Sequence, residues 1–103
     1  MAIPPTNEIR VGILATFLMK DNELIIGKKE ISTYLRAGEM LLEKNEVVTV
    51  KARGSTIPRA ITVVEIFKRQ NKATTTDIRI GTDVFKTGDR TSNVSSIEID
   101  IER

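Results

Sequence analysis

The sequence predicts a single small α/β domain, an α+β sandwich in which two helices cover one face of a four-stranded mixed sheet. Two observations support this fold class. The chain has 103 residues, 40% of them hydrophobic, which is enough for one compact core but not for two. The spacing of apolar residues also changes along the chain in the order β-α-β-α-β-β, and right-handed crossovers would place both helices on the same face.

The first strand and the first helix are predicted from a short apolar run and a helical periodicity. The run Leu24–Ile26 predicts a strand that ends at Gly27. From Ile31 onward, apolar residues recur at spacings of three and four. This pattern predicts an amphipathic helix that continues to about Lys44.

A glycine separates the second strand from the second helix. Val47–Ala52 is apolar and β-branched, which predicts a strand buried on both faces. Gly54 breaks this strand, and Ser55 or Thr56 is expected to cap the following helix. Pro58 fits the first helical turn, where a missing N–H costs nothing. The predicted apolar stripe of this helix comprises Ile57, Ala60, Ile61, Val64 and Phe67.

The last two strands are predicted from alternation of apolar and polar residues. Asn71–Thr76 is polar and reads as a break. The segments Ile78–Ile80 and Ile97–Ile101 then alternate isoleucine with charged residues, which is typical of half-exposed strands. Between them, Thr82–Asn93 contains Gly88-Asp89, so we expect a long hairpin tip there.

The N-terminal residues 1–22 are expected to be an extension, and residues 23–103 to form the domain. The longest apolar run, Val11–Met19, is about half the roughly 20 residues that a membrane span needs, and its charged flanks are poor for a signal peptide. We therefore expect no membrane association, and expect the first eighteen residues to be dispensable for folding. Two alternatives stay open: an extra element packed on the core, or Met19 as the natural start.

Several function classes are excluded or disfavoured by composition. The chain has no Cys and no His, which excludes disulfides and thiolate metal sites and removes the commonest general base. A chain without Cys also fits a reducing, cytoplasmic setting. We expect no catalysis, cofactor or small-molecule substrate, because no nucleophile or metal cluster accompanies the carboxylates. Those carboxylates are Glu39, Glu43, Glu65 and Glu98.

Basic residues gather in part of the chain, although the net charge is only +2. Lys51–Lys72 holds six bases and one acid, whereas Glu98–Arg103 holds three acids and one base. Gly27-Lys28-Lys29 lies at a strand-to-helix junction, where a helix N-terminus attracts phosphate. Cations there oppose the helix dipole, so an anion is expected to visit them. The alternative is that both lysines are ordinary solvated side chains.

The second strand-to-helix junction offers three further cations. Lys51 and Arg53 project to the same face of their strand, because side chains alternate. Arg59 lies in the first turn of the next helix. Both junctions would then share one anion site at one end of the sheet, unless these are structural charges at strand ends.

The hairpin adds two cations and an aromatic ring. Lys86 and Arg90 lie near its tip, diluted by Asp83 and Asp89. An arm of roughly six residues would reach about 20 Å, enough to enter a groove, and Arg favours the narrow minor groove. For Phe85, packing against the turn is favoured over stacking on a base.

Five ordered strings closely resemble the Alba family of archaeal chromatin proteins, from about Leu24 to Glu102. These strings are IIGKK, VKARG, AITVVEI, IRIGTD and VSSIEI. The resemblance implies a fold like the C-terminal domain of bacterial translation initiation factor three. It also implies a homodimer that binds double-stranded DNA with little sequence preference, and RNA as well, on the chromosome in the cytoplasm. The residues matching the family's binding positions are Lys28, Lys29, Lys51, Arg53, Arg59 and Arg90.

Three functions remain open at this point. The first is an architectural protein that coats DNA. The second is an RNA-binding subunit, as in RNase P-type particles, in which eukaryotic relatives of the family serve. The third is a protein-interaction module. Acetylation of Lys28 or Lys29 would remove a charge and act as a switch under either of the first two.

Overall fold

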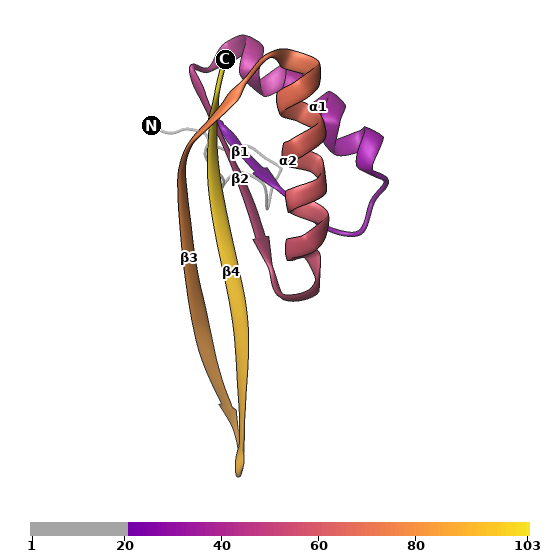
Figure 1. The fold of residues 1–103 in the computed structure, drawn as a ribbon. Helices are drawn as coiled ribbons and strands as arrows, with labels where there is room; N and C mark the ends of the chain where they lie inside the picture. Colours follow the sequence, from indigo (N-terminus) through magenta and orange to yellow (C-terminus); the bar gives the residue numbers. More distant parts are fainter. Residues whose placement is uncertain (1–20) are drawn as a thin grey trace, which may run out of the picture.

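A computed structural model describes residues 21–103 of the chain. The apolar run Val11–Met19 and almost all of the expected extension lie outside the described residues. The order of elements is β-α-β-α-β-β, which confirms the predicted fold class (Figure 1). The elements are β1 (Glu23–Ile25), α1 (Ile31–Lys44), β2 (Val47–Arg53), the short 3-10 turn η2 (Gly54–Thr56), α2 (Ile57–Asn71), β3 (Thr74–Thr87) and β4 (Arg90–Glu102).

The four strands form one mixed sheet in the order β1-β2-β4-β3. β1 pairs with β2 in parallel, and β4 pairs with β2 and β3 in antiparallel register. Both helices lie on one side of the sheet, and we call the other side the open face (Figure 1). Along β2, Val48, Val50 and Ala52 are buried under the helices, while the residues between them are only partly buried. The prediction that this strand is buried on both faces is therefore wrong, because the helices cover one face only.

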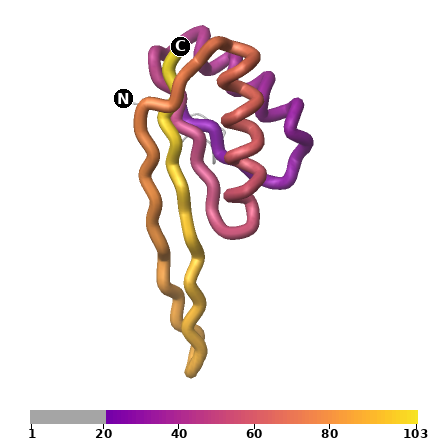
Figure 2. The backbone as a smooth tube through the Cα atoms, viewed as in Figure 1, coloured from indigo at the N-terminus to yellow at the C-terminus, as the bar shows by residue number. Residues whose placement is uncertain are grey.

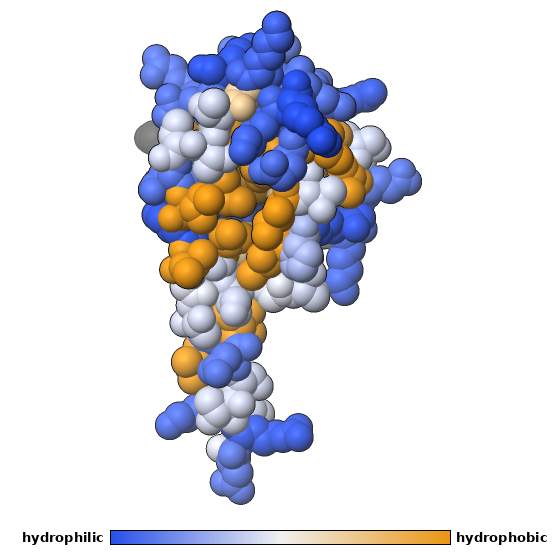
Figure 3. Space-filling model, in the orientation of Figure 1, coloured by the Kyte–Doolittle hydropathy of each residue, from blue (hydrophilic) through white to orange (hydrophobic). Residues whose placement is uncertain are grey.

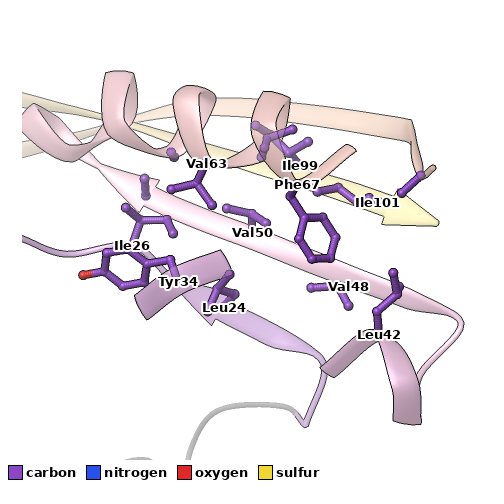
Figure 4. Close-up of a cluster of buried hydrophobic side chains, with 14 residues drawn as sticks. Leu24, Ile26, Tyr34, Leu42, Val48, Val50, Val63, Phe67, Ile99 and Ile101 are labelled. Carbon is purple, nitrogen blue, oxygen red and sulfur yellow. The ribbon is translucent and has the colours of Figure 1, made fainter. Parts of the chain in front are cut away.

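The core lies between the helices and the sheet, and its buried side chains come from both α-helices and from every strand except β3 (Figure 4). Val48, Val50, Val63 and Ile101 are almost completely buried. The helices approach closely at Gly38 in α1, where an added Cβ would lie 3.0 Å from Cε1 of Phe67. The predicted apolar stripe of α2 is partly wrong. Val63, which was not predicted, is buried, whereas Ile61, which was predicted, is 47% exposed. Neither helix among residues 21–103 is long and apolar enough to cross a membrane.

The hairpin of β3 and β4 is longer than the sequence indicated. The two strands pair as far as Thr87 and Arg90, so only Gly88-Asp89 forms the turn. The arm projects well beyond the helices (Figures 1 and 2). The predicted tip Thr82–Asn93 is therefore mostly paired strand, and the predicted polar break shrinks because β3 already begins at Thr74. Threonine and valine are enriched in strands, and pairing with β4 continues through this segment.

Candidate nucleic-acid interface

The loop that carries Lys28 and Lys29 is held in place by a buried tyrosine. The Tyr34 hydroxyl accepts hydrogen bonds from the backbone N–H groups of Gly27 at 2.8 Å and of Lys29 at 3.0 Å. Its ring packs in the core while its hydroxyl lies at the edge of the core (Figure 4). Those two N–H groups are therefore occupied within the protein, and the exposed lysine side chains are what the loop presents to solvent. From its spacing in the sequence, three residues after Ile31, Tyr34 is predicted only to belong to the apolar stripe of α1.

Arg59 ties the same loop to the start of α2. Its guanidinium donates to the carbonyl oxygen of Lys29 through Nη2 and through Nε, the latter at 3.2 Å. Lys28 and Arg59 line a hollow of about 430 Å³, together with Ser55 and Thr56. The first turn of α2 contains no acidic residue, so its N-terminal dipole also favours an anion there. We call this the helix-side hollow.

The turn before α2 is stabilised differently from the prediction. The Thr56 hydroxyl accepts from the N–H of Arg53 at 3.3 Å and donates to the carbonyl oxygen of Arg53 at 2.8 Å. α2 has no side-chain cap hydrogen bond, so the expected capping by Ser55 or Thr56 is wrong. Pro58 does lie in the first turn of α2, as predicted.

Lys51 lies on the open face and not beside the helix-side hollow. Its Nζ is 3.4 Å from Oε2 of Glu23 and 3.7 Å from Oε2 of Glu98. The cations of the two junctions are therefore not all brought together: Lys28 and Arg59 line the helix-side hollow, whereas Lys51 lies on the other face of the sheet. The reason is the alternation of β2, which sends Lys51 away from the helices.

Arg53 lies on the open face near the end of β2 and is bound to the hairpin. Its guanidinium forms an ion pair with Asp83, and its Cζ is 5.8 Å from the ring centre of Phe85. Beside it is a second hollow, of about 400 Å³, which we call the open-face hollow. The lining of this hollow includes Ile25, Lys51, Arg53, Asp83, Ile97 and Glu98.

Further along the open face, Arg79 joins three carboxylates. Its guanidinium is 2.7 Å from Asp77, 3.1 Å from Glu98 and 2.9 Å from Asp100. Hydrogen bonds from Arg79 lower the pKa of Asp100, and a 2.8 Å hydrogen bond from Thr49 acts in the same direction. Hydrogen bonds to Asp100, Asp77 and Glu98, of which the first has the largest effect, raise the pKa of Arg79. This part of the open face is thus occupied by internal ion pairs and offers little free positive charge.

The tip of the hairpin carries Lys86 and Arg90, both exposed. Within residues 21–103, neither forms an ion pair. Hydrophilic side chains surround the tip in Figure 3, at the end of the arm farthest from the core. The predicted site residues thus fall into three groups: Lys28, Lys29 and Arg59; Lys51 and Arg53; and Lys86 and Arg90. No group of His, Cys, Asp or Glu among the described residues is placed to hold a metal ion.

Apolar side chains on the helix side remain uncovered, a feature that the charge pattern did not reveal. Ile78 and Ile80 of β3 are 56% and 82% exposed, and Val84 is 60% exposed. Their partners in β4 show that they point to the helix side of the sheet, as Ile99 does. Figure 3 shows apolar surface gathered over the body next to the arm. β3 is an edge strand that neither helix covers, which explains the exposure.

Comparisons with known proteins agree with this fold. The sequence model of the Alba family matches residues 22–82. The DNA/RNA-binding protein Alba of Nitrosopumilus maritimus is 36% identical over 84 residues, which are 78% of this chain and 88% of that protein. Alba from Thermoplasma volcanium superposes with a TM-score of 0.70 at 35% identity, covering 80% of this chain and all of that one. An Alba protein from Trypanosoma brucei gives a TM-score of 0.69 at 24% identity, over 82% of this chain and 70% of that one, which is a likeness of fold.

Proposed function

Because the chain belongs to the Alba family, we propose that it binds double-stranded DNA with little sequence preference, and also RNA, as a non-enzymatic homodimer. The name of its relative from Nitrosopumilus maritimus, a DNA/RNA-binding protein, supports both ligands. We further propose an architectural role on the chromosome in the cytoplasm, with acetylation of Lys28 or Lys29 as a means of weakening binding.

The observation that carries this proposal is the helix-side hollow. Lys28 and Arg59 flank it, Lys29 adjoins it, and the N-terminus of α2 contributes its dipole. These cations form no ion pair with another residue of 21–103, in contrast to those of the open face. Phosphates are recognised by such groups in a manner that carries no sequence information, which accounts for weak sequence preference.

The uncovered apolar surface supports the homodimer. Ile78, Ile80 and Val84 share one face of β3 and are all more than half exposed. Exposed apolar surface of this kind marks an interaction site in soluble proteins. A two-fold axis would bury the patch of each copy against its equivalent. The dimer would also carry two hairpin arms, and so present Lys86 and Arg90 twice.

The proposal is tested by measuring affinity against salt concentration on two unrelated blunt duplexes and one structured RNA. The variants are Lys28→Ala and a matched control, Lys44→Ala, which removes the same charge at the opposite end of α1. Each neutralised phosphate contributes about −0.9 to the slope of log affinity against log salt. Loss of Lys28 removes two contacts per dimer, so the slope should become shallower by about 2 on both duplexes, whereas Lys44→Ala should leave it unchanged. Equal slopes for the parent and both variants would refute this site.

A further inference from the structure

We infer that the open face carries a second nucleic-acid site, formed by Phe85, Arg53 and the open-face hollow, that binds an unpaired nucleotide. This inference rests on the proposed function and deepens it. It concerns the side of the sheet opposite the helices, where the sequence favoured packing against the turn over base stacking for the aromatic ring.

The position of Phe85 gives the first reason. The turn consists of Gly88-Asp89, and Phe85 pairs with Ser92 within the ladder, so the ring does not pack in the turn. It lies on the open face with Asp83, because residues two apart in a strand share a face. The residue is 47% exposed. A large apolar ring left accessible beside cations is the kind of side chain on which unpaired bases stack.

Arg53 extends this stacking surface. Its ion pair with Asp83 fixes the guanidinium, whose Cζ lies 5.8 Å from the ring centre of Phe85, within the range of a cation–π contact. A guanidinium plane also stacks on nucleobases and binds phosphate through paired N–H groups. The two side chains therefore offer adjacent surfaces for a base and for its backbone.

The hollow beside Arg53 matches the chemistry of a nucleotide. Its volume of about 400 Å³ falls within the roughly 300–1,000 Å³ of small-molecule sites. Ile25 supplies apolar surface for the face of a base, and Lys51, which lies between Glu23 and Glu98, supplies a second cation for phosphate. The carboxylate of Glu98 can accept from the exocyclic amino group of a base, as acidic side chains do with cytosine.

The site adjoins the helix-side hollow, so one nucleic-acid molecule can reach both. Thr56 lines both hollows, which places them on either side of the η2 turn. A backbone held by Lys28 and Arg59 can thus continue around this turn towards Arg53. A base within a duplex is stacked and paired and cannot enter, so the site selects single-stranded segments next to a duplex.

The experiment compares two probes with the full chain at one salt concentration. One probe is a blunt RNA duplex, and the other is the same duplex with a single-stranded overhang that contains 2-aminopurine. The parent should bind the overhang probe about tenfold more tightly, because stacking on one aromatic side chain is worth roughly 1–3 kcal/mol per base. Phe85→Leu keeps an apolar side chain but removes the ring, and should abolish this preference while changing affinity for the blunt duplex by less than about twofold. Phe85→Tyr keeps the ring and should retain the preference.

The fluorescence of 2-aminopurine reports stacking directly. It should be quenched by the parent and by Phe85→Tyr, but not by Phe85→Leu. Equal binding of both probes by the parent, or an unchanged preference in Phe85→Leu, would overturn the unpaired-nucleotide site and leave the proposed function intact. Failure of the parent to bind either probe near physiological salt would instead refute the proposed function, and this inference with it.

Discussion

Replacing Asp83 by Asn is expected to strengthen binding to a blunt duplex. Arg53 is ion-paired with Asp83, and their side chains are 56% and 55% exposed. A phosphate competes with this carboxylate for the same guanidinium, since both accept paired N–H groups. Binding through Arg53 must therefore break an internal ion pair first, and Asp83→Asn removes that competitor.

The magnitude follows from the exposure of the pair. Exposed ion pairs contribute roughly 0.2–1 kcal/mol, and the proposed dimer contains two of them. Taking about 0.5 kcal/mol for each, Asp83→Asn should raise affinity by about 1 kcal/mol, or about fivefold. The slope with salt should also change. In the parent, the Asp83 carboxylate that Arg53 releases takes up a cation from solution, which cancels the cation released from the phosphate. In Asp83→Asn no carboxylate is freed, so each phosphate contact of Arg53 adds about −0.9 to the slope of log affinity against log salt. With two such contacts per dimer, the slope should steepen by about 2.

The assay is a salt titration of blunt-duplex binding for the parent, Asp83→Asn and Asp89→Asn. Asp89 lies in the turn of the same hairpin and forms no ion pair with another described residue, so its replacement controls for the loss of one negative charge. Urea unfolding should show a stability change below about 1 kcal/mol for both variants. Equal affinities and slopes for the two variants would mean that Asp83 does not compete with phosphate for Arg53.

Three further changes test the loop, the dimer and the open face. Tyr34→Phe removes the acceptor of two backbone N–H groups, so urea unfolding should show a loss of about 1–3 kcal/mol and duplex affinity should fall severalfold; full affinity would show that the loop needs no such support. Ile80→Asp places a charge on a side chain that is 82% exposed, so sedimentation should show a folded monomer, and a persisting dimer would move the interface elsewhere. Hydrogen bonds from Arg79 lower the pKa of Asp100 below its ordinary value of 3.8. The ionised carboxylate therefore stabilises the fold above pH 3.8, and this contribution is lost as the pH falls through the pKa of the folded state. Urea unfolding between pH 6 and about pH 2 should therefore show a weaker acid dependence for Asp100→Asn than for the parent, and an identical dependence would exclude this contribution.

Most of the fold could be predicted because its core elements obey simple periodicities. α1 begins at Ile31 and ends at Lys44, as the spacing of its apolar residues indicated. The hairpin arm could not be predicted to its full length, because β3 is exposed along both faces and buries no alternating set. Beyond Ile80, its strand backbone is held by pairing with β4 alone, and a ladder of this kind leaves no periodic signal in the sequence.

The site was only partly predictable, because its partners come from distant parts of the chain. Alternation correctly placed Lys51 and Arg53 on one face, but nothing local indicated that Glu23 and Glu98 would flank Lys51. The role of the Tyr34 hydroxyl was equally hidden, since the ring alone satisfies the apolar pattern of α1. Contacts between strands that are far apart in sequence depend on sheet order, and sheet order does not follow from periodicity.

The pairing of charges, more than their number, determines where this chain can hold a phosphate. Arg79 carries the same positive charge as Arg59, yet three carboxylates surround its guanidinium and balance that charge. Arg59 uses its donors on a neutral carbonyl oxygen, so its positive charge stays available to an anion in the helix-side hollow. The availability of Arg53 is intermediate. It is ion-paired with a single exposed carboxylate, that of Asp83, and a phosphate can replace this carboxylate. The net charge of +2 therefore does not reveal where an anion can bind. The cations of the open face have carboxylate partners, so under the proposed function only the helix-side hollow and the tip would contact a phosphate without first losing such a partner.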